Sequence, residues 1–315
     1  MPKEADMPYI NQITNSFTDM QKTNSPLVAI HTLVYNHEPF LRDYFEGIIM
    51  QKTTFPFIAV VHDDFSTDNS ASIIREYAEK YPDIIKPIFE DHNCYYTDWD
   101  NAYKKIFKAY NGAKYLAFCE GDDYWTDPEK LQRQVDFLEN NPDYSAIAEN
   151  GIVKYTYSKK EHPFNKERSH DVNIQEVIIS RRFPTAGVVC RLDCFNDYRD
   201  TCTIHTDTIE WCWLLSKGKF RYDDTISSVY RRGPQGVTIS TEPYVFAKTI
   251  EKWNMEILRV FNVKKDFIYL HIAKIYKSFI GQSIHSHHYM SAIKCCYRCG
   301  LFLLKTIGAK LGFRK

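Results

Sequence analysis

Three acidic side chains follow directly on an apolar run near the middle of the chain. Residues 115–119 are apolar and strand-like, and Glu120, Asp122 and Asp123 come next. Carboxylates crowded at the end of a buried strand repel one another and lose hydration, so a cation must compensate their charge. Mg²⁺ and Mn²⁺ prefer oxygen ligands and keep coordination sites open for substrate phosphates. The pattern therefore predicts a Mn²⁺ or Mg²⁺ site that serves a phosphorylated leaving group.

A second acidic pair follows another apolar run earlier in the chain. Asp63 and Asp64 come directly after the expected strand 57–62. Because ligands bind at the carboxyl ends of parallel strands, both acidic clusters should face one crevice. This expectation rests on strand order alone.

Strands and helices alternate between residues 27 and 140. The pattern predicts strands at 27–35, 57–62, 84–89 and 115–119, and helices at 39–51, 99–110 and 128–140, with another helix ending near Tyr81. Asp127 is the expected N-cap of the helix at 128–140, with Pro128 in its first turn. Such alternation is typical of an α/β fold with a mostly parallel sheet flanked by helices.

Regularity loosens after residue 144. We expect a polar loop at 158–173, a helix at 208–215 and a mostly helical region from residue 243 onward. The predicted organisation is a polar N-terminal arm (1–25), an α/β domain (26–242) and a helical, basic C-terminal region (243–315).

Charge is divided unevenly along a chain whose formal net charge is zero. Residues 248–315 hold 13 Lys/Arg and 3 Asp/Glu, whereas residues 1–247 hold 27 Lys/Arg and 37 Asp/Glu. A zero balance argues against nucleic acid as a partner. The last segment interleaves basic and apolar residues, which suits either an anionic membrane surface or a merely solvated terminal helix. Its basic members are Lys294, Arg298, Lys305, Lys310, Arg314 and Lys315, and its apolar members include Leu301, Phe302, Leu304, Ile307 and Leu311.

Six of the nine cysteines are scattered along the chain, and the polar N-terminus has no secretory pattern. Together these features predict a cytoplasmic chain with reduced thiols, and they leave open a peripheral position on the inner membrane face. No run of 18 apolar residues occurs, so we expect no transmembrane helix. One cysteine and histidine cluster leaves a zinc site open as an alternative, although its spacing fits no zinc-finger pattern. The cluster comprises Cys295, Cys296, Cys299, His285, His287 and His288.

Three segments together resemble family 2 glycosyltransferases. They are residues 34–38 (Val-Tyr-Asn-His-Glu), residues 62–68 (His-Asp-Asp-Phe-Ser-Thr-Asp) and residues 120–125 (Glu-Gly-Asp-Asp-Tyr-Trp), each after an expected strand. The resemblance covers about residues 26–240. It implies a GT-A, Rossmann-like fold and an inverting enzyme that uses a nucleotide-activated sugar.

The resemblance also implies roles for individual residues. Asp122 is the implied metal ligand, and Asp207 the implied catalytic base. The residues implied to bind the nucleotide-sugar are Tyr35, Asn36, Glu38, Asp63, Asp64, Glu120, Asp123, Trp125 and Arg231. The segment from Tyr230 to Thr238 is implied to close over the diphosphate.

Two departures from the family pattern stand out. Glu120 replaces the usual first Asp of the metal motif, and the histidine that often follows the Tyr-Arg pair is missing from residues 232–235. The role of Glu120 and the contacts of the diphosphate on that side are therefore open.

Each of these residues also has an ordinary structural role open to it. The acidic pairs could form turns or caps, Asp207 could cap the helix that follows it, and Trp125 could belong to the core.

The predicted function is metal-dependent inverting transfer of a sugar, with a UDP-sugar favoured, to a hydroxyl of a glycan or lipid-linked acceptor in bacterial surface polysaccharide synthesis. A metal ion stabilises the leaving diphosphate, and a carboxylate takes the proton of the acceptor hydroxyl. One alternative is a sugar nucleotidyltransferase, although residues 35–39 are not the Gly-rich, Arg-containing loop that such enzymes place after the first strand. The other alternative is a catalytically inactive, membrane-associated relative.

Overall fold

The computed structural model describes residues 25–95, 97–233 and 242–311. The expected N-terminal arm, except Ser25, lies outside these residues. The same holds for Gly236, Val237 and Thr238 of the segment expected to close over the diphosphate.

Four parallel strands form the first half of the sheet, as the sequence predicts. They are β1 (Val28–Val34), β2 (Phe57–Asp63), β3 (Ile85–Phe89) and β4 (Tyr115–Phe118), in the spatial order β3-β2-β1-β4. The helices α2 (Leu41–Ile49), α3 (Ser70–Lys80) and α4 (Trp99–Ala109) connect them. Strand order reverses at β1, whose neighbours β2 and β4 lie on its two sides, and ligands of open α/β sheets bind at such a reversal.

The second half of the sheet is mixed, because antiparallel strands lie beside a long parallel pair. Strand β9 (Val188–Arg191) runs antiparallel between β4 and β6 (Tyr144–Tyr155), and β6 pairs in parallel with β10 (Lys219–Arg232). Strand β5 (Tyr124–Trp125) is antiparallel to β10.

The segment 158–173 is not entirely the loop that the sequence predicts. It contains β7 (Glu161–Pro163), which pairs with β6, and β8 (His170–Asp171), which pairs with β10. These strands have only two or three residues each, so they are too short to show an apolar alternation.

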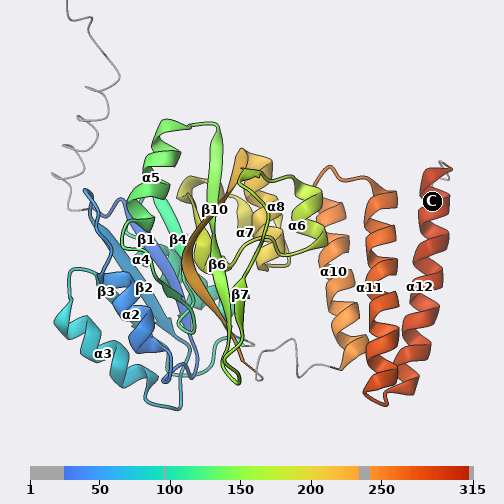
Figure 1. Ribbon diagram of the computed structural model, residues 1–315, viewed down its shortest axis with the longest axis horizontal. Coiled ribbons are helices and arrows are strands. Elements are labelled where there is room, and N and C mark those ends of the chain that lie inside the picture. Colours follow the sequence, from blue (N-terminus) through green and yellow to red (C-terminus); the bar gives the residue numbers. More distant parts are fainter. Residues whose placement is uncertain (1–24, 96, 234–241, 312–315) are drawn as a thin grey trace, which may run out of the picture.

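Apolar side chains cover both faces of the sheet. Val28 and Ile30 of β1 pack in one cluster with α2, α3 and α5 (Lys130–Asn140), and Ala29 packs in the other cluster with α4 and α8 (Asp207–Lys217). Side chains of successive strand residues point to opposite faces, which explains this division. Figure 1 shows the helices on both sides of the twisted sheet.

Three long helices form the C-terminal region, as predicted. They are α10 (Pro243–Val260), α11 (Lys265–His285) and α12 (Tyr289–Lys310). Their buried residues Ala247, Ile257 and Ile272 share one core with α6 (Ile174–Ile179) and α8. In Figure 1, α12 is the outermost of the three. The short element η1 (Thr185–Gly187) precedes β9, and η2 (Leu192–Phe195) and α7 (Tyr198–Thr201) lie between β9 and α8.

Candidate active site

The two acidic clusters follow neighbouring strands of the parallel half. Both β2 and β4 pair with β1, so Asp63 at the end of β2 and Glu120 just after β4 flank the turn that follows β1. Gly121 permits close packing there, because a Cβ at this position would lie 2.8 Å from Val34 and 2.9 Å from Nδ1 of His37. Burial lowers the pKa of His37, and the charges of Asp122, Asp68 and Asp63 act in the opposite direction. That both clusters face one crevice stays a prediction.

Burial and mutual repulsion raise the pKa values of Glu120 and Asp123 after β4. The Leu33 N–H donates to Oε2 of Glu120 (3.1 Å), and burial raises the pKa of Glu120 well above its usual value, with further increases from Asp122 and Asp207. Burial also raises the pKa of Asp123, whose Oδ1 accepts the N–H of Arg231 (2.8 Å). In the described part of the chain, no donor is bonded to the half-buried Asp122 carboxylate. A bound cation is needed for all of these carboxyl groups to be ionised at the same time.

The turn after β1 is fastened to the loop after β2. Asn36 adopts a left-handed conformation (φ 56°), and its Oδ1 accepts the N–H of Thr67 (2.8 Å). Glu38 accepts both the N–H and the side-chain amide of Asn69. The side chains of Asn36 and Glu38 therefore fix this loop, while Tyr35 beside them remains 48% exposed. Contact of these residues with a nucleotide stays a prediction.

Asp63 and Asp64 each hold a backbone turn. Asp63 accepts the hydroxyl and N–H of Ser66, and burial raises the pKa of the Asp63 carboxyl. Asp64 accepts the N–H groups of Cys94 (2.6 Å) and Tyr95 (3.2 Å). Both aspartates thus have the turn-forming role that the sequence left open. Contact of Asp63 and Asp64 with a nucleotide stays a prediction.

Asp207 lies at the start of α8 and is held by two donors. Thr206, and not Asp207, is the N-cap, since its side chain accepts the N–H of Ile209. Oδ2 of Asp207 accepts Nη2 of Arg181 (2.9 Å) and Oγ1 of Thr185 (2.8 Å). Oδ1 has no donor among the described residues. One oxygen of the expected base is thus anchored, and the other remains available.

Arg181 links Asp207 to the acids after β4. Its guanidinium lies 5.1 Å from the ring centre of Tyr230. Burial by itself would lower the pKa of Arg181, but the charges of Asp207 and Asp123 act on it and contribute to a net increase. Sequence reasoning missed Arg181 and Thr185, because 26 and 22 residues separate them from Asp207 and neither stands in a recognisable motif.

A second acid lies one turn further along α8. Burial and, to a smaller extent, the nearby charge of Asp207 raise the pKa of Glu210 to about 8. Glu210 is therefore mostly protonated at neutral pH, which limits the charge gathered around Asp207.

Arg231 has protein partners on all sides. Its Nη1 donates to the carbonyl oxygen of Asp122 (2.8 Å), its Nη2 forms an ion pair with Asp43, and its guanidinium lies 4.3 Å from the ring centre of Tyr124. The side chain is 7% exposed. Arg231 therefore positions the loop that carries Asp122. Contact between Arg231 and the nucleotide-sugar stays a prediction.

Trp125 belongs to the core, which corrects its expected contact with a sugar. It is 1% exposed, its indole N–H donates to the carbonyl oxygen of Ala186 (2.8 Å), and the Lys130 ammonium lies 4.7 Å from its ring centre. Burial lowers the pKa of Lys130 to about 8. No face of the indole is left for a ligand.

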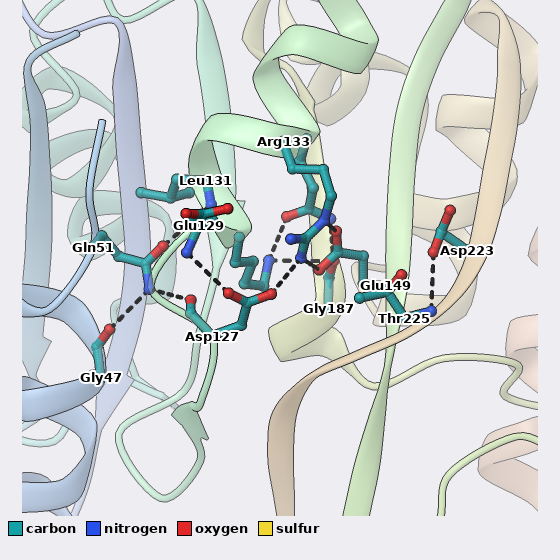
Figure 2. A network of polar contacts seen from close by, with 12 residues as sticks. Gly47, Gln51, Asp127, Glu129, Leu131, Arg133, Glu149, Gly187, Asp223 and Thr225 are labelled. Carbon is teal, nitrogen blue, oxygen red and sulfur yellow. Dashed lines mark hydrogen bonds and ion pairs between the residues drawn. The ribbon is translucent and has the colours of Figure 1, made fainter. Parts of the chain in front are cut away.

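A polar network surrounds Asp127, in the segment between β5 and α5 (Figure 2). Arg133 binds Glu149 through two nitrogens (2.8 and 3.0 Å) and Asp127 through Nη2 (2.7 Å). Gln51, just after the end of α2, donates to the carbonyl oxygen of Asp127 and accepts the N–H of Leu131. Asp127 accepts the N–H of Glu129, so it caps a turn before α5, and the helix begins at Lys130 and not at Pro128 as expected. The network fixes α5 and the chain preceding it against α2 and β6.

The acids after β4 fit a divalent cation that also binds substrate phosphates. Asp122 is free of donors within the described ranges, and Asp123 gives only Oδ1 to a backbone N–H. Mg²⁺-type sites use one or two carboxylates together with phosphates. The described residues contain no group of three or more His, Cys, Asp or Glu side chains that could hold a metal by themselves. This also removes support for the zinc alternative, because Cys295 is buried and Cys296 is exposed on α12.

The chain belongs to glycosyl transferase family 2, whose sequence profile matches residues 29–220. Among curated relatives, an uncharacterized protein of Mycobacterium tuberculosis is 34% identical over 165 residues, which cover 52% of this chain and 46% of that protein. The dTDP-rhamnosyl transferase RfbG of Shigella flexneri is 30% identical over 127 residues, which cover 40% of this chain and 43% of that protein. The chain thus spans less than half of the length of these relatives.

Solved structures show the same fold. Staphylococcus aureus TarS 1–349 in complex with UDP-GlcNAc has a TM-score of 0.62 at 17% identity, covering 90% of this chain and 81% of that one. The mannosyltransferase PcManGT from Pyrobaculum calidifontis, in complex with GDP-Man and Mn²⁺, has a TM-score of 0.55 at 15% identity, covering 98% of this chain and 90% of that one. The expected family and the GT-A fold are confirmed.

Proposed function

We propose that the protein is a metal-dependent inverting glycosyltransferase that uses a nucleotide-diphosphate sugar. One observation carries the proposal: at the strand-order reversal, the donor-free carboxylate of Asp122 and the half-anchored carboxylate of Asp207 both act on Glu120. Sugar transfer needs this pair of functions, a site for the leaving diphosphate and a base for the acceptor. Membership of the family supports the same reading.

Each residue of the site has a distinct proposed role. Asp122 and Asp123 would hold Mn²⁺ or Mg²⁺, which as a Lewis acid stabilises the negative charge that develops on the leaving diphosphate. Asp207 would accept the acceptor's hydroxyl proton on Oδ1, while Arg181 and Thr185 keep Oδ2 in place. A single carboxylate base suffices for inversion, since attack comes from the face opposite the leaving group.

A UDP-sugar donor is favoured, because the similar solved structures of TarS were obtained with UDP and with UDP-GlcNAc. GDP- and dTDP-sugars belong in the same test, since other relatives are named for GDP-Man and dTDP-rhamnose. We further propose a glycan or lipid-linked acceptor in bacterial surface polysaccharide synthesis, on the cytoplasmic side of the membrane.

A thermal-shift screen with sugar nucleotides tests donor and metal together. Ligand at 100 times its dissociation constant stabilises a protein by about 2.7 kcal/mol. We expect one sugar nucleotide with Mn²⁺ to raise the melting temperature, and a chelator to remove the increase. If no sugar nucleotide stabilises the protein under either condition, the proposed donor class is wrong.

Two variants then separate the proposed roles. Asp122→Asn should abolish the Mn²⁺-dependent stabilisation and the hydrolysis of the donor. Asp207→Asn should keep donor binding and lose transfer. Asp136→Asn, an exposed acid on α5 that accepts a hydrogen bond from Gln132, is the matched control and should change neither. Unchanged transfer in Asp207→Asn would show that Asp207 is not the base.

The same assays decide between the alternatives. A sugar nucleotidyltransferase would consume a nucleoside triphosphate and a sugar 1-phosphate and release pyrophosphate. A catalytically inactive relative would bind the donor without turnover in the wild type.

A further inference from the structure

One side of α12 is packed and the opposite side is open to solvent. Ala292, Cys295, Phe302 and Thr306 face inward and are buried, and Phe302 lies near Tyr269 and Tyr276 of α11. Figure 1 shows α12 at the edge of the molecule, with α11 between it and α10. The packing of α12 therefore uses only the inner half of its circumference.

The open side is apolar along the whole helix. Large apolar residues recur there in steps of three and four, with Gly300 at the one position that lacks a large side chain. They are Met290, Ile293, Tyr297, Leu304, Ile307 and Leu311, and each is between 56% and 70% exposed. Positions spaced in this way lie on one face of a helix. We call these six residues the outer apolar face. Such a contiguous exposed apolar surface marks an interaction site.

The surroundings of this face are basic. Helix α12 carries Lys294, Arg298, Lys305 and Lys310 and no acidic residue. Residues 243–311 contain only three acids, and two of them are paired internally, Glu251 with Arg298 and Glu256 with Arg259. Apart from these pairs, Asp266 and the N-cap Glu242, which accepts a hydrogen bond from Ser291, are the acids left to offset the lysines of the three helices.

We propose that the outer apolar face of α12 binds an anionic lipid surface, with the helix axis in the plane of that surface. An apolar face flanked by Lys and Arg is the pattern of helices that lie in the headgroup region, where buried apolar area and attraction to anionic lipids act together. No described helix is long and apolar enough to cross a membrane. The face therefore lies on the lipid surface and does not span it.

Charge argues against a second copy of the chain as the occupant. Pairing two outer apolar faces would bring Lys294 and Lys310 of each copy toward the same cations of the other, because α12 supplies no acid to compensate them. Like charges across an interface are unfavourable. An anionic lipid surface supplies the missing charge.

Cosedimentation with vesicles tests the proposal on the full-length protein. The vesicles contain phosphatidylcholine alone or a mixture with phosphatidylglycerol. We expect binding only to the phosphatidylglycerol vesicles, and we expect it to weaken at higher salt. The double variant Ile293→Ser/Leu304→Ser should bind at least 10-fold more weakly, because burial of each large apolar side chain contributes about 1.5–3 kcal/mol. The control Tyr157→Ser/Ile226→Ser removes two exposed apolar residues outside the C-terminal region and should bind like the wild type.

A second variant tests the electrostatic part separately. Lys294→Gln/Lys305→Gln/Lys310→Gln should weaken binding on the order of 100-fold, since each basic residue near an anionic surface contributes about a factor of ten or less. Circular dichroism should show wild-type helix content in all variants, because the replaced side chains are exposed.

Light scattering after gel filtration identifies the competing occupant. A dimer that Ile293→Ser/Leu304→Ser converts to a monomer, without vesicle binding by the wild type, would overturn the proposal in favour of a second copy. Absence of vesicle binding, or binding that neither variant weakens, would also overturn it. The vesicle assay involves no sugar transfer, so Asp207→Asn should bind vesicles like the wild type. A negative vesicle result would therefore not bear on the proposed glycosyltransferase activity.

Discussion

Asp207 has two unlike oxygens, and this difference argues for a positioning role of Arg181. Oδ2 receives two hydrogen bonds, from Arg181 and Thr185, whereas Oδ1 receives none from a described residue. A base must present one oxygen to the acceptor hydroxyl at hydrogen-bond distance. The anchored Oδ2 fixes the direction in which Oδ1 points.

At the residue scale we therefore predict that Arg181→Gln lowers kcat by roughly 10-fold or more and leaves the dissociation constant of the donor nearly unchanged. Arg181→Lys should recover part of the activity, because it keeps the charge but loses the planar geometry. Steady-state kinetics and calorimetric titration of UDP with Mn²⁺ measure the two quantities. Arg182→Gln is the control, since Arg182 binds Glu167 and not Asp207. A large loss of UDP affinity in Arg181→Gln would instead show that Arg181 binds the diphosphate.

The elements differ in how well the sequence predicts them, for physical reasons. Strands β1, β2 and β4 are largely buried and rich in apolar residues, so their positions in the chain follow from the sequence. Strand β3 is only partly buried, but Ile85, Ile88 and Phe89 still mark it. Strands β5, β7 and β8 have two or three residues each and depend on pairing with the much longer strands β6 and β10.

The site is likewise predictable only where its residues follow a recognisable strand. Asp122 and Asp123 follow β4 as expected, but the family resemblance implies a ligand contact for Trp125, which is buried. The partner of its indole N–H, the carbonyl oxygen of Ala186, is 61 residues away and no local pattern reveals it. The contact of Arg181 with Asp207 is hidden for the same reason.

At the element scale, the close approach of α2 to β5 gives a prediction. A Cβ on Gly47 would lie 2.8 Å from both the backbone nitrogen and the carbonyl oxygen of Trp125, which cannot yield easily. Gly47→Ala should lower the free energy of unfolding by about 1–3 kcal/mol and reduce activity, because it shifts the strand that follows Asp123. Urea denaturation and kinetic assays measure both effects.

Gly281→Ala is the matched control for this change. Gly281 lies on α11, where an added Cβ would meet no atom within 4 Å, so alanine there should stabilise the helix by about 0.5–1 kcal/mol. A Gly47→Ala protein as stable and active as the wild type would show that β5 can move away from α2 without consequence for the site.

At the scale of the whole molecule, one carboxylate ties the basic helices to the acidic α/β domain. Glu256 of α10 accepts the N–H of Thr203 (2.6 Å) and binds Arg259, and Arg259 also donates to the carbonyl oxygen of Thr201 (2.7 Å). The hydrogen bonds from Arg259 and from Thr203 lower the pKa of Glu256 to about 2. Since this folded-state value lies below the unfolded one, the contribution to stability is full above pH 4.5 and is lost as the pH falls from 4.5 toward 2.

We predict that Glu256→Gln lowers the free energy of unfolding by about 2 kcal/mol at pH 6, and that its difference from the wild type shrinks steadily below about pH 4.5. Urea denaturation of both proteins at several pH values between about 3 and 6 measures the difference, so that titration of other acids cancels. Glu79→Gln, on the exposed side of α3, should differ little from the wild type at every pH. Limited proteolysis at about pH 6 should cleave Glu256→Gln faster between α8 and α10, because docking of the helices is weakened. A difference from the wild type that stays constant down to about pH 3 would show that the ionised form of Glu256 does not hold the two parts together.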